Sequence, residues 1–66
     1  MSESIPAFYV RLTTGRLGPA WDVDTAIRSA YEAEIGGQRK AILIEQAGEV
    51  VVHEADLRAA IRKLAA

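Results

Sequence analysis

Two short apolar runs lie within residues 40–53, and a turn that contains a glycine separates them. Both runs are rich in valine and isoleucine, the β-branched residues that favour strands. Gly48 lies between them at a position typical of a tight turn. The pattern therefore predicts a β-hairpin.

The register of this hairpin follows from the faces that each loop length would create. A two-residue loop of Ala47 and Gly48 would mix apolar and polar side chains on both faces. A three-residue loop, residues 46–48, places Gly48 at the left-handed position that such a loop requires. We therefore expect the three-residue loop, which leaves Leu43 and Val51 on one face. It pairs the residues of the other face, the expected core face, as follows: Ile44 with Val50 and Ile42 with Val52.

Residues 7–13 predict another strand, because strand-forming residues alternate there between two faces. On its less covered face, Tyr9 and Arg11 are an aromatic and a basic side chain of the kind that stacks on a base and contacts its phosphate. Residues 16–21 are either a loop or a short edge strand, since Pro19 is compatible only with an edge. The sole tryptophan, Trp21, ends this segment, and we expect it to cover a small core.

Two segments have the 3.6-residue apolar period of amphipathic helices. The first begins after Asp22 or Asp24, either of which can cap its free amides, and ends at Gly36 and Gly37. The second covers residues 54–66 and consists mainly of strong helix formers. The apolar side chains that we expect against the sheet come from both helices: Ile27, Tyr31, Leu57, Ile61 and Leu64.

These elements predict a single compact domain, residues 1–66, of the α+β class. The expected order is β-α-β-β-α, with a three-stranded, mostly antiparallel sheet and two helices on one face. An extra short edge strand at 16–21 remains open. If both helices cover the same face, Leu43 and Val51 stay partly exposed.

Composition narrows the classes of function. A chain of 66 residues without cysteine has no disulfide framework, no thiolate nucleophile and no sulfur-ligated metal. Its net charge of −1 argues against nucleic-acid binding driven by overall charge. No run approaches a membrane span, and the first residues lack the basic and apolar regions of a signal peptide. We therefore expect a cytoplasmic protein that does not bind membranes.

Charged residues gather on the two predicted helices. The first carries acidic residues outside its apolar stripe, at Asp24, Glu32 and Glu34. The second carries a short basic patch at Arg58, Arg62 and Lys63, of which the last two lie near its end. Both groups are typical of solvated helix faces, and both are able to steer a charged partner.

Candidate chemistry is sparse. His53 is the only histidine, and no nucleophile accompanies it with a spacing that indicates catalysis. Asp22 and Asp24 are better explained as helix caps than as metal ligands, since a full set of oxygen ligands is lacking. We therefore expect no enzymatic activity, no cofactor and no metal.

In its size, its mixture of strands and helices and its lack of catalytic motifs, the chain resembles the small inhibitors of phages and mobile elements, such as anti-CRISPR proteins and small antitoxins. The resemblance implies a non-enzymatic module that occludes a surface of a larger nucleic-acid-processing complex, as a monomer or a homodimer. We expect the acidic face (Asp24, Glu32 and Glu34) to bind the partner, with the alternative surface at Leu43, Val51, Arg58, Arg62 and Lys63. The alternative function is a small nucleic-acid-binding domain that uses the sheet face or the basic last helix.

Overall fold

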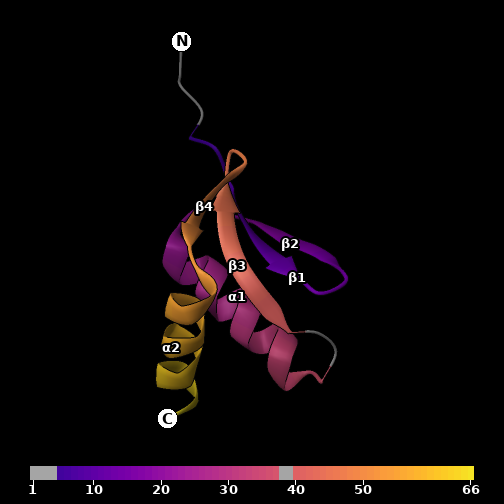
Figure 1. Ribbon diagram of the computed structural model, residues 1–66, viewed down its shortest axis with the longest axis vertical. Coiled ribbons are helices and arrows are strands. Elements are labelled where there is room, and N and C mark those ends of the chain that lie inside the picture. Colours follow the sequence, from indigo (N-terminus) through magenta and orange to yellow (C-terminus); the bar gives the residue numbers. More distant parts are fainter. Residues whose placement is uncertain (1–4, 38–39) are drawn as a thin grey trace.

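The computed structural model describes residues 5–37 and 40–66. Four antiparallel strands form one sheet in the order β2-β1-β3-β4, and two helices accompany it (Figure 1). The α+β class is therefore as expected. The elements are β1 (Phe8–Leu12), β2 (Gly15–Ala20), α1 (Val23–Ile35), β3 (Ala41–Gln46), β4 (Glu49–Val52) and α2 (Glu54–Ala65).

The extra edge strand that the sequence left open is present as β2. It pairs with β1 alone, so its outer side is an edge of the sheet. Pro19 is tolerated there because an edge strand has backbone positions that need not donate to a neighbour. The peptide bond between Gly18 and Pro19 is cis.

The core lies between one face of the sheet and both helices. Val10 and Ile44 face each other across β1 and β3, and both are fully buried. Small residues let α1 lie close to the sheet, since Ala26 and Ala30 are its buried positions. From α2 the buried contributions to this core are Leu57 and Ile61, as predicted.

The predicted hairpin register is wrong. The loop has two residues, Ala47 and Gly48, with φ of 53° and 83°, the doubly positive combination of a type I′ turn. Gln46 faces Glu49, so the loop cannot be the three-residue one. A shift between Ile44 and Glu45 then restores an apolar pairing by bringing Ile44 opposite Val52.

The two-residue loop and this shift together change the predicted core face. Ile44 and Val52 contribute to the core, but Val50 is opposite Glu45 and is 40% exposed. A second shift, between Arg11 and Leu12, pairs Leu12 with Ala41. Ile42 is left half-buried and Ala41 takes its place in the core. β-Bulges of this kind add one residue to a strand and exchange its faces from that point onward.

The helix boundaries agree closely with those predicted from the sequence. The burial predicted for the last apolar residue of α2 does not. Asp22 is the N-cap of α1: its Oδ1 accepts a hydrogen bond of 2.7 Å from the backbone N–H of Thr25. That backbone hydrogen bond lowers the pKa of Asp22. Leu64, expected in the core, is 42% exposed, because it lies in the last turn of α2 beyond the edge of the core.

Gly18 allows β1 and β2 to approach closely. Its φ is +149°, and a Cβ there would lie 2.8 Å from Cδ2 of Tyr9 and 3.0 Å from the carbonyl oxygen of Phe8. Gly15, with φ of +152°, has open space at the same position. The backbone conformation disfavours a side chain at both glycines, but only at Gly18 would a Cβ also collide with neighbouring atoms.

We expect Gly18→Ala to lower the free energy of unfolding by about 1–3 kcal/mol. Gly15→Ala is the matched control, since it shares the backbone strain without the contact, and its loss should be smaller. Urea denaturation measures both losses. Equal losses of unfolding free energy in the two variants would show that the contact with Tyr9 does not contribute to the need for glycine at Gly18.

Candidate functional site

The acidic face expected on α1 is not one surface in the structure. Glu34, expected to face solvent, is turned toward α2, and its side chain is only 19% exposed. Asp24 lines a groove between α1 and α2 together with Lys63. Glu32 lines a hollow between α1 and β2. The three carboxylates therefore meet different neighbours, and the expectation of a joint binding face loses its geometric basis.

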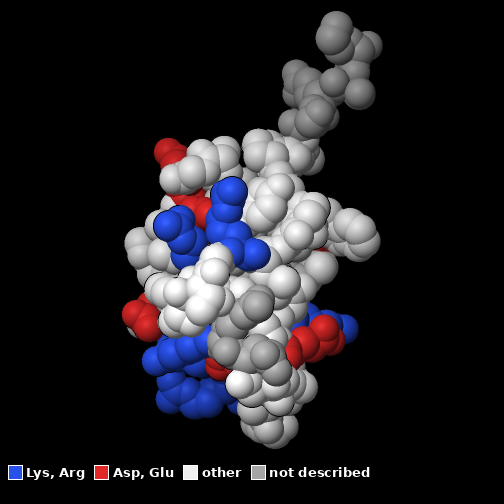
Figure 2. All heavy atoms as spheres, turned by 90° about the vertical axis from the view of Figure 1, so that its right-hand side faces the viewer, with Lys and Arg blue, Asp and Glu red and all other residues white. Residues whose placement is uncertain are grey.

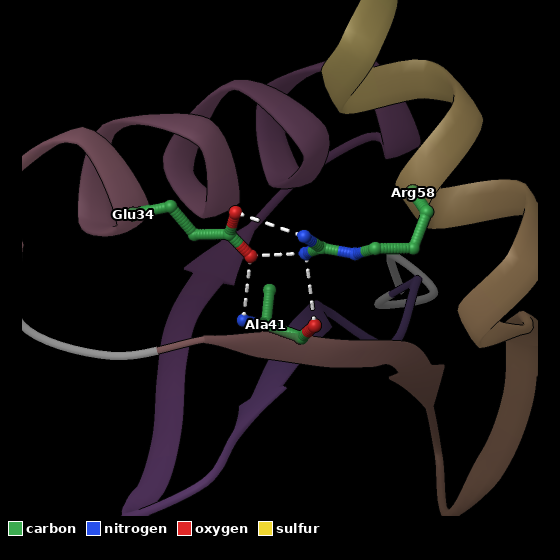
Figure 3. Close-up of polar contacts among 3 residues, drawn as sticks. All are labelled: Glu34, Ala41 and Arg58. Carbon is green, nitrogen blue, oxygen red and sulfur yellow. Dashed lines mark hydrogen bonds and ion pairs between the residues drawn. The ribbon is translucent and has the colours of Figure 1, made fainter.

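Glu34 and Arg58 form an ion pair that joins three elements (Figure 3). Arg58 Nη1 donates to Glu34 Oε1 at 3.0 Å, and Nη2 donates to Glu34 Oε2. At the start of β3, the N–H of Ala41 donates to Glu34 Oε2 at 2.8 Å, while its carbonyl accepts from Arg58 Nη2 at 3.0 Å. We call this arrangement the Glu34–Arg58 clasp; it holds α1, α2 and β3 together.

The side chains of the clasp are partly buried, and their interaction changes the pKa of both charged groups. The hydrogen bonds from Arg58 hold the pKa of Glu34 below its ordinary value, against an opposing effect of burial. The same bonds raise the pKa of Arg58. Both groups are therefore charged at neutral pH and paired with each other, although the buried Nε of Arg58 has no hydrogen-bond partner among the described residues. Arg58 belongs to the alternative binding surface predicted from the sequence. In the structure its guanidinium group instead pairs with Glu34 and helps to hold the fold together.

The remaining residues of that alternative surface are dispersed. Arg62 and Lys63 lie exposed in the last turn of α2. Leu43 is half-buried opposite Arg11 on the face of the sheet away from the helices. Val51 is 42% exposed in edge strand β4. These residues come from two sides of the molecule.

Trp21 does not cover the core, contrary to expectation. Its side chain lies between β2 and α1 and is 82% exposed. Ile5, which is 80% exposed, lines the same hollow of about 320 Å³. The reason is local: the chain turns into α1 at Asp22, and Ala20, one residue before Trp21, takes the buried position at the end of β2. Trp21 and Ile5 therefore place two large apolar side chains at the surface beside this hollow.

The hollow beside Trp21 adjoins a second one. The first is lined by Ile5, Ala7, Pro19, Ala20 and Trp21. The second, of about 420 Å³, is lined by Leu17, Gly18, Pro19, Ser29, Glu32 and Ala33. They share Pro19, so we treat them as one β2-side surface, apolar near Trp21 and acidic at Glu32. The described residues that line it include no lysine or arginine.

A second group of interacting side chains lies on the face of the sheet away from the helices. Arg11 and Arg16 are direct cross-strand neighbours, and each donates through Nη1 to Glu45 at 3.5 Å. The Arg16 guanidinium also lies 5.1 Å from the centre of the Tyr9 ring. Figure 2 shows basic side chains next to acidic atoms on this side of the molecule. We call Tyr9, Arg11, Arg16 and Glu45 the sheet-face cluster.

The sequence predicted that two of the four residues of the sheet-face cluster lie on one face of the sheet. The alternation in the first strand placed Tyr9 and Arg11 on one face, as the structure has them. Arg16 was missed because it joins the face only if β2 forms. Glu45 was missed because its position opposite Tyr9 depends on the pairing of β1 with β3. A firm prediction of β2 would have revealed the cluster.

The described residues that were considered for catalysis or metal binding do not form a common site. His53 is exposed and precedes α2 as its N-cap residue, with no side-chain capping bond. In the part of the chain that the structure describes, no three His, Cys, Asp or Glu residues are grouped so as to hold a metal ion. Within those same residues, no helix has the length and apolar character needed to cross a membrane.

Comparison with protein-family models, with curated proteins and with solved structures finds no match to this chain.

Proposed function

We propose that this protein is a small, non-enzymatic binding module that acts by covering a surface of a larger protein. The observation that carries the proposal is Trp21, which is 82% exposed at the edge of the β2-side surface. Tryptophan is among the residues that contribute most to binding energy when a partner buries them. A solvent-exposed tryptophan beside an exposed isoleucine is therefore suited to anchor a protein contact.

The partner that we propose is a larger nucleic-acid-processing complex. Glu32 gives the β2-side surface a negative charge next to its apolar part. Such a surface complements a groove that carries basic side chains for nucleic acid. Of the acidic residues first expected to bind, Glu32 therefore remains in the proposed interface, whereas Glu34 is held in the clasp.

We expect Trp21→Ala to weaken partner binding at least tenfold without loss of stability. Truncating an exposed residue usually changes the free energy of unfolding by no more than about 0.5 kcal/mol. The matched control is Ile35→Ala, another exposed apolar truncation, in the last turn of α1. Quantitative co-purification of both variants and the wild type from the native host identifies the partner, and calorimetry with the purified partner measures affinity.

A second measurement tests whether the module inhibits. Adding the purified protein to its partner should lower the partner's affinity for nucleic acid, and the Trp21→Ala variant should not. A partner that binds the Trp21→Ala variant as tightly as the wild type would show that another surface is used. A partner whose nucleic-acid binding is unchanged would refute inhibition by occlusion.

A further inference from the structure

We infer that the sheet-face cluster binds a single strand of nucleic acid, with Arg11 and Arg16 holding its phosphate groups. The first argument is charge. Arg11 and Arg16 are directly opposite on β1 and β2, a pairing of like charges that destabilises a sheet. Glu45 bridges the two arginines but supplies only one negative charge. The cluster therefore keeps an excess positive charge that an anion would balance.

The second argument is the position of the donors. The carboxylate of Glu45 is only 11% exposed, whereas the side chains of Arg11 and Arg16 are 55% and 60% exposed. Glu45 thus holds both guanidinium groups from below and acts as a positioning residue. Among the hydrogen bonds of the described residues, each guanidinium uses one N–H on Glu45. The other donors are free to bind phosphate oxygens, for which the guanidinium geometry is well suited.

The third argument concerns the rest of this face, which favours nucleic acid over other anions. Tyr9 lies opposite Glu45 and beneath Arg16, so the phosphate-binding groups adjoin an aromatic ring. Leu43, opposite Arg11, and Val50, opposite Glu45, extend the face with apolar contacts. Bases of a single strand can stack on an aromatic ring or on the plane of an arginine guanidinium, whereas those of a duplex are covered by their neighbours.

The open shape of the face completes the case. The buried residues of both helices belong to the core on the other side of the sheet. In the part of the chain that the structure describes, the cluster therefore lies on a face of β2, β1 and β3 that neither helix covers and that an extended strand can cross. The cluster is separate from the residues that line the β2-side surface around Trp21. This inference does not rest on the proposed function, and either can fail alone.

Fluorescence anisotropy of a labelled oligothymidylate of about 15 nucleotides tests the inference. At about 50 mM salt the wild type should bind, and the double variant Arg11→Gln, Arg16→Gln should bind at least tenfold more weakly. The slope of log affinity against log salt should fall by about 1.4, because each phosphate contact to a single strand contributes about 0.7. Circular dichroism confirms that the variants fold.

Two controls separate this site from general electrostatics. The double variant Arg62→Gln, Lys63→Gln removes the same charge from exposed positions of α2 and should keep the wild-type affinity within twofold. Tyr9→Leu should weaken the oligonucleotide complex, since the aromatic ring is lost. A polyglutamate peptide of equal charge should bind at least tenfold more weakly than the oligonucleotide.

Three outcomes would overturn the inference. The first is no anisotropy change for the wild type at low salt. The second is an equal loss of affinity in the α2 control, which would indicate binding by net charge alone. The third is equal affinity for polyglutamate, which would indicate a site for acidic peptides. Trp21→Ala should leave oligonucleotide binding unchanged whatever its effect on the protein partner.

Discussion

Replacing Ile44 by alanine is expected to leave a large fraction of the molecules unfolded at room temperature. Ile44 has no exposed surface and occupies β3, between β1 and β4. The core has three large side chains that are fully buried among the described residues, Ile44, Leu57 and Val10, and several of its other members are alanines. One truncation therefore removes a major part of the apolar packing.

The magnitude follows from measured truncations of this type. An isoleucine-to-alanine change in a core costs about 2–5 kcal/mol, because the lost contacts leave a cavity that closes only partly. Marginal stability of about 0.05–0.15 kcal/mol per residue gives a 66-residue domain roughly 3–10 kcal/mol in total. The loss is thus a large fraction of the whole stability and, at the lower end of that range, equals or exceeds it. Ile44→Val, which removes one methylene, should cost about 0.5–1.5 kcal/mol and remain folded.

Leu43→Ala is the matched control for Ile44→Ala. Leu43 is the preceding residue of the same strand, but it is half-buried on the opposite face of the sheet. Thermal unfolding followed by circular dichroism should show a clearly smaller loss for Leu43→Ala. A larger loss at Leu43 than at Ile44 would mean that the core lies on the other side of the sheet.

Much of the fold was predictable because each element has its own local pattern. The β-branched runs of the hairpin and the apolar period of both helices are properties of neighbouring residues. The cap at Asp22 is likewise local, since a short carboxylate accepts the amide of Thr25 three residues later. Interactions of this range are readable from a single sequence.

The register and the core face were not predictable for a physical reason. A bulge inserts one residue into a strand without requiring a distinctive composition, and it exchanges the faces beyond it. The two-residue loop places Val50 opposite Glu45 and therefore outward, and the shift between Ile44 and Glu45 then returns Val52 to the core, although both valines favour burial equally. Strict alternation therefore assigned Val50 wrongly.

The candidate surfaces were only partly predictable because they depend on contacts between distant segments. Hydrophobicity suggested burial for Trp21, but the turn into α1 leaves it exposed. The periodicity of α1 placed Glu34 outside the apolar stripe, yet its partner Arg58 is 24 residues away on α2. The distance between two helices decides whether such groups meet, and no local pattern contains that information.

The Glu34–Arg58 clasp should make the stability of the protein sensitive to acid. Glu34 accepts hydrogen bonds from Arg58 and from the N–H of Ala41, and these interactions require its ionised form. We expect Glu34→Gln to lower the free energy of unfolding by about 1.5–3 kcal/mol at neutral pH, the usual range for hydrogen bonds to charged groups. Because the pair is partly exposed, added salt should reduce this loss.

The direction of the pH dependence follows from the pKa of Glu34. Its pKa is lower in the folded protein than the ordinary value of 4.5, with the hydrogen bonds from Arg58 as the main cause. The unfolded chain therefore takes up a proton first as the pH falls. The stabilisation is fully present above the ordinary pKa and is lost as the pH falls through the folded pKa. Arg58 stays charged throughout this range.

Urea denaturation of the wild type and Glu34→Gln at a series of pH values measures the effect. The difference in unfolding free energy should be largest near neutral pH and should vanish below the folded pKa of Glu34. Glu32→Gln is the matched control, since it makes the same change on the same helix at an exposed position, and it should leave the acid sensitivity unchanged. If Glu34→Gln keeps the full acid sensitivity of the wild type, another carboxylate controls it. The clasp would then contribute little to holding α2 against α1 and β3.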